Sequence, residues 1–538
     1  MNASRVMDPI TTEVIGSLLA TISEEMSAAL VRTAYSPNIK ERADCSTAVF
    51  DRDGRVVAQA QRLPMHMGSL LGSVQEIVDR FPVASLADGD MFIANDPYTG
   101  GGSHLPDLNV VAPVFDEGSL IGFVANIAHH SDVGGMVAGS ESAACTSIYQ
   151  EGLRLPPMRL CAAGEVCEEI IELVKLNSRT PADRDGDLRA QVAANVVGTR
   201  GLREVCKRYG TATVADQMSD VLTATAQRIR SRLTELPDGT YEHTEWMDRG
   251  FGAEEPVAIH ARVTVDGGRL QVDFAGTAQQ LESGRNIPLG ATKATVFSVV
   301  KSFIDPYVPS NAGFYDAIEV VAPPGCVVNP EPPAAVSARA LTSAIVADAV
   351  VGALSAAVPD RAVAPSGPHQ LMILSGPGHH EEGYFVDYET FAGALGARPD
   401  RPGMDAVRVY ASGASNLPVE PLEHAFPLLV ERYEVRQGSG GGGRHRGGHG
   451  IRRDYRILSS EATVELTGER QERGARGAAG GADGAPGEFV LNPGTEREQR
   501  LPGVVTGLRL QRGDVISIRT PGGGGYGDPP GEASRTET

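Results

Sequence analysis

Residues 108–128 read LNVVAPVFDEGSLIGFVANIA, and this stretch decides how the N-terminal part of the chain can fold. Two apolar runs flank the turn-forming residues DEGS (116–119), a pattern that predicts a β-hairpin. With the turn centred on Glu117-Gly118, the numbers of facing residues add up to about 235, so residue 129 faces 106 and residue 128 faces 107. The hairpin therefore places the segment before it beside the segment after it.

Those two segments are GGGSHLPD (100–107) and AHHSDVGG (128–135), and both carry groups that bind metals. Two imidazoles and a carboxylate are a common ligand set for Zn²⁺, Mn²⁺ or Fe²⁺. Successive residues of a strand point to opposite faces, so only one of the two adjacent histidines can join the set. The alternative is a group of polar residues that bond to the local backbone at the mouth of the hairpin. The candidate ligands are His104, Asp107 and either His129 or His130.

The stretch KERADCS (40–46) and the histidine of PMHMGSL are further candidates. Asp44 could complete the metal shell, although a surface loop of ion pairs is the simpler interpretation. His66 and His130 are candidates for substrate binding, and a buried structural histidine is the alternative for each. Cys45 lies beside these groups, but no general base is identifiable for a thiol nucleophile.

The rest of the chain mixes helical and strand patterns. Asp8 and Pro9 suit the start of a long helix with an apolar face. Two short strand-like runs surround an Asp53-Gly54 turn, and ARVTVDGGRLQVDF, after residue 240, predicts a second hairpin. Helices are predicted over 8–35, 71–81, 168–232 (with breaks at Pro181 and Gly201), 294–304 and 342–358, a strand over 91–95, and short strands over 425–520.

The whole pattern predicts an α+β fold of several mixed layers, with a metal-bearing hairpin near the N-terminus and a mostly β C-terminal region. The predicted divisions are a metal-binding region over 1–238, a central α+β region over 239–424, a β-rich region over 425–525 and a disordered tail over 526–538.

Composition narrows the class of protein. The chain has 538 residues and a net charge of −20, which argues against nucleic acids and anionic membranes as partners. We expect no membrane span, because no window of about 18 apolar residues stands out, and no signal peptide. Six scattered cysteines without a C-x-x-C pair favour a reducing, cytoplasmic location.

Two glycine-rich runs, GSGGGGRHRGGHG (438–450) and TPGGGGYGDP (520–529), resemble phosphate-binding loops only in composition. Neither matches G-x-x-x-x-G-K-[ST], and no such motif occurs in the chain. We interpret them as tight turns between β elements or as a subunit contact. The segment from Arg436 to Arg453 has five arginines and no acidic residue, which predicts a subunit interface or a channel for an anionic intermediate, with a solvated basic loop as the alternative.

With these motifs in order, the chain resembles the hydantoinase B/oxoprolinase family, which includes subunits of N-methylhydantoinases, 5-oxoprolinases, caprolactamases and acetone or acetophenone carboxylases. The resemblance runs from residue 8 to 529 through DPITTEVI, IKERADCSTAVFD, NDPYTGGGSHLPD, AHHSDVGG, GDLRAQVAAN, NPEPPAAVSAR, SNLPVEPLE, SGGGGRHRGGHG and TPGGGGYGDP. It implies a divalent metal held by Asp44, His104, Asp107 and His129, and so selects His129 over His130.

The resemblance also implies a partner. Family members work with an A-type subunit of actin-like ATPase fold, which would bind ATP in place of this chain. The implied reaction is the ring opening of a small cyclic amide that the partner has activated by phosphorylation, in a hetero-oligomer of A and B subunits. The alternatives are the large subunit of an ATP-dependent ketone carboxylase and a metal-stabilised scaffold without catalysis.

Overall fold

The predicted hairpin forms the middle of a seven-stranded antiparallel sheet in the computed structural model, which describes residues 8–99, 101–410 and 412–529. The strand order is β2-β1-β5-β4-β3-β6-β7. Its central strands are apolar on both faces and buried, because helices cover each face of the sheet. The strands are β1 (Cys45–Asp51), β2 (Val56–Gln59), β3 (Met91–Ala94), β4 (Asp107–Asp116), β5 (Ser119–His129), β6 (Met158–Ala162) and β7 (Glu165–Val166).

The predicted hairpin register is correct at the turn but wrong by one residue at the open end, where the candidate ligands lie. At the turn, Asp116 faces Ser119, as expected, and Glu117 and Gly118 both have positive φ, as a two-residue turn of this kind requires. A bulge between Val114 and Phe115 then shifts the pairing, so Asp107 faces His129 directly.

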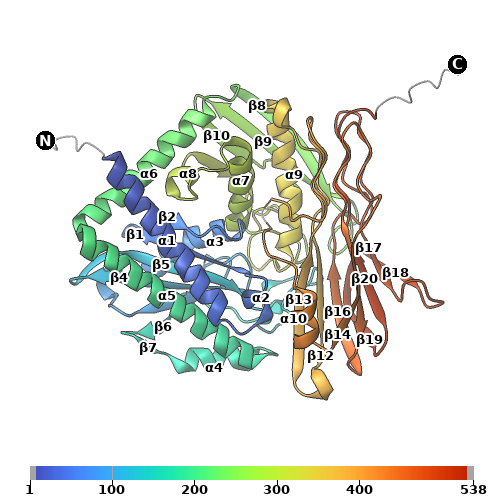
Figure 1. The fold of residues 1–538 in the computed structure, drawn as a ribbon, viewed down its shortest axis with the longest axis horizontal. Coiled ribbons are helices and arrows are strands. Elements are labelled where there is room, and N and C mark those ends of the chain that lie inside the picture. Colours follow the sequence, from blue (N-terminus) through green and yellow to red (C-terminus); the bar gives the residue numbers. More distant parts are fainter. Residues whose placement is uncertain (1–7, 100, 411, 530–538) are drawn as a thin grey trace.

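Helices pack on both faces of this sheet (Figure 1). The apolar face of α1 is buried against β1 and α5, and burying one leucine or isoleucine side chain is worth about 1.5–3 kcal/mol. The break predicted at Pro181 is confirmed, but the one at Gly201 is wrong, because the helix continues to Gly210. Gly201 instead lets α5 pack closely on Ile22. The helices are α1 (Pro9–Thr33), α2 (Pro37–Lys40), α3 (His66–Arg80), α4 (Glu168–Asn177), α5 (Pro181–Tyr209) and α6 (Thr211–Leu233).

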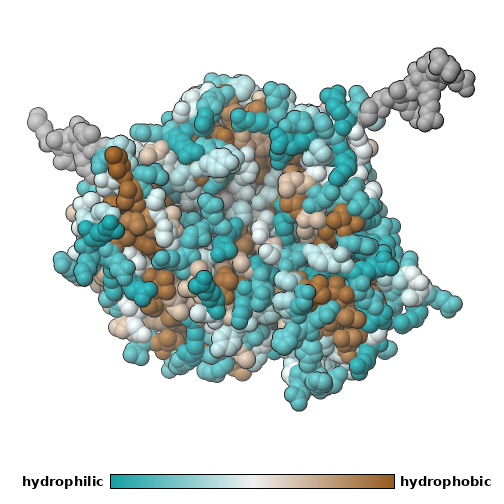
Figure 2. All heavy atoms as spheres, viewed as in Figure 1, coloured by the Kyte–Doolittle hydropathy of each residue, from teal (hydrophilic) through white to brown (hydrophobic). Residues whose placement is uncertain are grey.

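A second layer consists of a four-stranded sheet, of order β11-β10-β9-β8, packed against α7 and α9. Two helices, α1 and α9, are long and apolar enough to cross a membrane by length and composition, so the expectation that the sequence holds no such apolar window is wrong. The apolar window of α9 is 83% buried inside the protein, as in a core helix. Figure 2 shows a mostly hydrophilic face with an apolar patch over α1, where Ile10 is 75% exposed. The elements are β8 (Gly239–Met247), β9 (Val257–Asp266), β10 (Arg269–Asp273), β11 (Ile318–Val321), α7 (Leu289–Ile304), α8 (Ala312–Tyr315) and α9 (Arg339–Ala357).

The C-terminal part is a β-sandwich, so the predicted β-rich C-terminal region is confirmed. One sheet has the order β13-β12-β16-β19 and the other β14-β15-β20-β17-β18, and a shared apolar core lies between them. The elements are β12 (Gln370–Pro377), β13 (Tyr384–Phe391), α10 (Val419–Ala425), β14 (Leu428–Val435), β15 (Ile451–Ile457), β16 (Glu461–Thr467), β17 (Glu488–Leu491), β18 (Gln499–Leu501), β19 (Val504–Gln511) and β20 (Val515–Arg519).

The glycine-rich runs are packed against each other and against neighbouring loops. A Cβ atom on Gly447 would lie 1.9 Å from the carbonyl oxygen of Gly523, and one on Gly522 would lie 1.9 Å from that of Ser439. Backbone hydrogen bonds, such as Gly441 N to Gly523 O at 2.9 Å, join the runs. Tyr526, at the start of the predicted tail, bridges to His445, and residues 530–538 lie outside the described residues.

Acidic residues outside the stretch from Arg436 to Arg453 accompany four of its five arginines; one of them, Asp454, directly follows the stretch in β15. The pairs are Arg436 with Glu488, Arg446 with Asp405, Arg452 with Asp454 and Arg453 with Glu389. The stretch is therefore largely neutralised within this chain, which weakens the argument that its charge needs a partner.

Candidate metal centre

The hairpin strands and the loop before them bring three predicted ligands together. Asp107 begins β4 and His129 ends β5, and the bulged register makes them direct neighbours across the two strands. His104 lies in the preceding loop, which the side chain of Asn95 ties down by donating to the carbonyl of Leu105 at 2.7 Å. All three ligand side chains are at least 98% buried.

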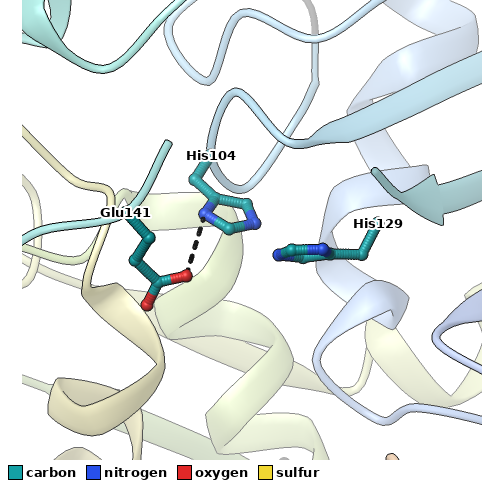
Figure 3. Close-up of side chains that lie close together, drawn as sticks. All are labelled: His104, His129 and Glu141. Carbon is teal, nitrogen blue, oxygen red and sulfur yellow. Dashed lines mark ion pairs between the residues drawn. The ribbon is translucent and has the colours of Figure 1, made fainter. Parts of the chain in front are cut away.

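The distances support a common centre. The Nε2 atom of His104 lies 3.4 Å from Oδ1 of Asp107. The rings of His104 and His129 point toward one another, with centroids 4.8 Å apart (Figure 3). This is an arrangement in which one ion could contact side chains from both strands.

His66 and Asp44 lie in the same cluster. His66 begins α3, and its Nε2 atom is 3.7 Å from Oδ1 of Asp44 and 3.8 Å from Oδ1 of Asp107. Its other nitrogen, Nδ1, lies 3.1 Å from Oγ of Ser46. His66 thus links the two carboxylates, and Asp44 approaches the centre from the side of β1.

Glu141 is a member of the cluster that the sequence did not reveal. The ligand atoms of His104, His129 and Glu141 lie within 4.8 Å of one another. Glu141 Oε2 is 3.8 Å from Nδ1 of His104 (Figure 3). The same oxygen accepts a hydrogen bond of 3.0 Å from the hydroxyl of Tyr388. Glu141 comes from an irregular loop, where no spacing in the sequence marks it as a ligand.

Three of the four predicted ligands each have one buried atom without a hydrogen-bond partner among the described residues: His104 Nε2, Asp107 Oδ1 and His129 Nε2. Leaving such atoms unpaired in a protein interior is costly, so unpaired groups that gather at one place need an explanation. A bound cation would satisfy all three, and the three residues therefore fit a metal ion. Since His104 Nδ1 lies 3.2 Å from the carbonyl of Ser337, Nε2 is the atom that is left for a metal.

The electrostatics also suit a cation, because metal ligands must be deprotonated. Burial, together with the charge of Arg339, lowers the pKa of His104 to about 4. Burial also lowers the pKa of His129 well below its usual value. Burial opposes ionisation of Asp107, but His104 and Arg339 outweigh it and hold the pKa of that carboxyl well below its usual range. Burial raises the pKa of Glu141 to about 7 and also raises that of Asp44.

Residues from distant segments hold the ligands in place. Arg339, at the start of α9, donates from Nη2 to Oδ2 of Asp107 at 2.9 Å and from Nε to Oγ of Ser103 at 2.9 Å. Asn38 of α2 lies 3.0 Å from Nδ1 of His129. The ring of Tyr388, on β13, is 4.4 Å from the ring of His129. The centre thus lies where the N-terminal sheet, α9 and the C-terminal sandwich meet.

The remaining candidates lie elsewhere or play other parts. His130 points to the opposite face, where its Nε2 lies 2.9 Å from Oε1 of Gln191 on α5. Burial raises the pKa of the Cys45 thiol to about 12, which agrees with the expectation that it is no nucleophile. Gly101 and Gly102 approach backbone atoms of Ser73 and Asn95, so these contacts explain the two glycines without a ligand.

Known proteins are similar in sequence to this chain over almost its whole length. The Hydantoinase B/oxoprolinase family matches residues 8–529. The 5-oxoprolinase of Dictyostelium discoideum is 31% identical over 532 residues, which are 97% of this chain but only 40% of that protein. Caprolactamase subunit beta of Pseudomonas jessenii is 31% identical over 540 residues, 97% of this chain and 91% of that subunit.

Solved structures show the same fold. The crystal structure of the ATP-dependent caprolactamase from Pseudomonas jessenii matches with a TM-score of 0.89 at 30% identity, over 97% of this chain and 92% of that chain. Nucleotide-free acetone carboxylase matches with a TM-score of 0.88 at 18% identity, over 97% of this chain and 76% of that chain, and this likeness concerns the fold alone. The sequence match from end to end and the shared fold lead to one conclusion: the chain belongs to the hydantoinase B/oxoprolinase family.

Proposed function

We propose that this chain is the B-type subunit of an ATP-dependent cyclic-amide hydrolase and carries its metal centre. The observation that supports this most is the set of unpaired, buried donor atoms on His104, Asp107 and His129. They come from the two ends of one hairpin, they are in the protonation states that metal ligands need, and they lie in a protein whose relatives include 5-oxoprolinase and caprolactamase.

When bound, a Zn²⁺, Mn²⁺ or Fe²⁺ ion would polarise the substrate carbonyl or lower the pKa of water. His104, Asp107 and His129 would hold it, with Asp44 as a further ligand. Glu141 keeps Oε1 unpaired while Tyr388 binds Oε2, so Glu141 can accept a proton from water at Oε1. His66 lies between the two carboxylates and is proposed to contact the substrate.

Unactivated amides resist hydrolysis because resonance stabilises the ground state, and phosphorylation of the amide oxygen removes that resonance. We assign this activation to an A-type ATPase partner, in line with the subunit nature of caprolactamase subunit beta. The burial of the whole cluster would then exclude bulk water from the activated amide. The six cysteines are all free thiols, as suits the cytoplasm, where we place this assembly.

A ketone carboxylase subunit is the second candidate, because the fold matches acetone carboxylase with a TM-score of 0.88. The same residues would then hold an enolate oxygen in place of an amide carbonyl. A scaffold role without catalysis is the third reading, but it leaves the unpaired donor atoms without a purpose.

Turnover by the reconstituted enzyme tests the proposal. The chain is co-purified with its A-type partner and supplied with ATP and, in turn, hydantoin, 5-oxoproline, caprolactam, or acetophenone with bicarbonate. We expect ATP-dependent ring opening of one cyclic amide, abolished by Asp107→Ala. Carboxylation of the ketone without amide hydrolysis would select the second candidate, and no turnover of any substrate would favour the scaffold.

A further inference from the structure

Two arginines lie next to the metal centre and converge on one threonine. Arg42 follows α2 and is 1% exposed, and its Nη2 donates to Oγ1 of Thr390 at 2.7 Å. Arg408 comes from the segment after β13 and donates from Nη1 to the same Oγ1 atom. Arg42 also contacts Asn38 Oδ1 at 2.6 Å, and Asn38 in turn contacts His129. The arginine pair is therefore one side chain away from a proposed metal ligand.

This arginine pair has no direct carboxylate contact among the described residues, and the nearest charge effects come from Glu389 and Asp44 at longer range. Among the described residues, no carboxylate lies within ion-pair distance of Arg42 or Arg408, whereas the buried Arg184, Arg285, Arg339, Arg453 and Arg470 each have one. The contacts of Arg42 are to neutral acceptors, such as the carbonyl oxygens of Tyr388 at 2.7 Å and Ser415 at 3.1 Å. Neutral acceptors satisfy hydrogen bonds but leave a buried positive charge uncompensated, which is costly.

Hydrogen-bond donors also remain unused around Thr390. The guanidinium of Arg42 has five N–H groups and four protein contacts, so one N–H is free. The Nε atom of Arg408 has no hydrogen-bond partner within the described part of the chain. Thr390 Oγ1 accepts from both arginines, so its own hydrogen points elsewhere.

His369 adds an unpaired polar atom to the same region. It directly precedes β12, next to the strand pairing of Leu371 with Thr390, and it is 2% exposed with Nδ1 unpartnered. Burial and then the charges of Arg408, Arg339 and Arg42 lower its pKa to about 3. Burial and the neighbouring Arg42 lower the pKa of Arg408 to about 9, which still leaves it charged at neutral pH. Burial is the largest cause of both shifts, the neighbouring guanidinium groups add to it, and at Arg408 the charges of Glu389 and Asp44 act in the opposite direction.

We propose that Arg42, Arg408, Thr390 and His369 form an anion site that holds the phosphoryl group of the activated substrate beside the metal centre. The inference rests on the proposed function, because only a phosphorylated amide brings a phosphoryl group to this chain. Phosphate matches the site chemically, since its oxygens accept several charge-assisted hydrogen bonds and arginine is the residue that binds them best.

The arginine pair would hold the phosphoryl group while the carbon atom that carries the phosphorylated oxygen faces His104 and His129. Water adds to that carbon, the ring C–N bond breaks, and the ring nitrogen takes a proton and leaves as the amine. The acyl phosphate that remains is hydrolysed by a second water to the carboxylate and phosphate.

Binding of inorganic phosphate to the isolated chain tests the site without the partner. Calorimetric titrations use the wild type, Arg408→Gln and Thr390→Val, with and without bound Mn²⁺, and acetate as a competing anion. We expect saturable phosphate binding by the wild type that persists without metal, exceeds acetate binding, and weakens at least about tenfold in Arg408→Gln. Arg408→Lys, which keeps the charge, should retain part of the affinity.

Arg401→Gln is the matched control, because Arg401 is more than half exposed and pairs only with Asp400. It should bind phosphate like the wild type. Thermal unfolding checks the fold of each variant, and Thr390→Val, which keeps both charges, decides the outcome if Arg408→Gln does not fold. The proposal is wrong if the wild type does not bind phosphate, or if it binds phosphate only when the metal is present. It is also wrong if phosphate binding is unchanged in both Arg408→Gln and Thr390→Val. Phosphate binding through Arg408 without turnover of any amide would reject the hydrolase and leave the anion site standing.

Discussion

The two carboxylate oxygens of Asp107 have different roles: one is held by hydrogen bonds, and the other is left for the proposed metal. The Oδ2 atom accepts from Arg339 at 2.9 Å and from Ser103, while Oδ1 has no hydrogen-bond partner among the described residues and lies 3.4 Å from Nε2 of His104. The ion pair with Arg339 offsets the cost of burying a carboxylate, and it also fixes the direction in which the free oxygen points. A purely structural aspartate would have partners for both oxygens.

The first prediction concerns the ligands themselves. The purified chain should carry a stoichiometric divalent transition metal, and His104→Ala and Asp107→Ala should each lose it, because each removes one of three gathered donors. Elemental analysis of the purified variants measures this. His379→Ala is the control, since His379 is an exposed histidine on the C-terminal sandwich and should leave the metal content unchanged. Full occupancy in both ligand variants would refute the centre.

The second prediction concerns Arg339. Arg339→Gln leaves the ligands in place but removes the charge that holds Asp107 ionised and oriented. We expect metal affinity to fall by about 10–100-fold, the usual effect of losing a residue that supports a metal ligand. Chelator competition measures the affinity, and Arg339→Lys should restore part of it. An unchanged affinity in Arg339→Gln would show that Ser103 alone suffices to orient Asp107.

Sequence reasoning found the candidate ligands that the hairpin joins, and it missed Glu141 and the supporting residues Arg339 and Tyr388. The convergence of His104, Asp107 and one of the two adjacent histidines was predictable because one hairpin joins their segments, whereas the choice of His129 came from the resemblance to the family. Arg339 and Tyr388 reach the centre from more than 200 residues away, and only tertiary packing brings them there. Glu141 is nearer in sequence, yet it lies in an irregular loop where no periodicity indicates the direction of a side chain.

At the scale of elements, the hairpin turn could be predicted from its residues, but the bulge in the same hairpin and the end of α5 could not. The turn at Glu117-Gly118 was predictable because it needs residues that tolerate positive φ. The bulge between Val114 and Phe115 was not, since a bulge has no comparable local signature, and it moves Asp107 directly opposite His129. The helix break expected at Gly201 occurs instead at Gly210, because packing on Ile22 favours a glycine within α5.

The third prediction belongs to the packed glycine runs. Gly447→Ala places a Cβ atom 1.9 Å from the carbonyl oxygen of Gly523, which requires a backbone shift. We expect a loss of about 1–3 kcal/mol in the free energy of unfolding, as overpacking usually costs. Gly442→Ala is the matched control in the same run, because a Cβ there would meet nothing within 4 Å. Denaturant unfolding compares the two variants, and equal stability would contradict this packing. The metal content of both should match that of the wild type.

At the scale of the whole molecule, the proposed metal centre and the glycine runs have different roles: the first is the proposed site, and the second packs the loops of the C-terminal region. The centre combines the ends of β4 and β5 with the start of α9 and one face of β13. The opposite face of β13 belongs to the sandwich core, where Glu389 pairs with the buried Arg453. One strand therefore joins the site to the C-terminal region, so the sandwich is part of the architecture of the centre.

The last prediction is that this chain alone does not hydrolyse ATP. A phosphate-binding loop presents free backbone N–H groups to the nucleotide. Here, the N–H groups of Gly441, Gly447 and Gly448 donate to Gly523 O, Gly441 O and Leu395 O, at 2.9, 2.8 and 2.9 Å. The runs that look most like a nucleotide loop in sequence thus have these amides bonded within the protein, and we expect the partner subunit to bind ATP.

A phosphate-release assay tests this with the isolated chain, the isolated A-type partner and the mixture, each with and without cyclic amide. We expect ATP hydrolysis to require the partner and to be coupled to amide consumption only in the mixture. The mixture made with Asp107→Ala should lose amide hydrolysis, because the metal centre is then incomplete, while ATP binding by the partner is unaffected. If the isolated chain hydrolyses ATP, and this activity stays with the chain through successive columns, the assignment of ATP hydrolysis to the partner subunit is wrong.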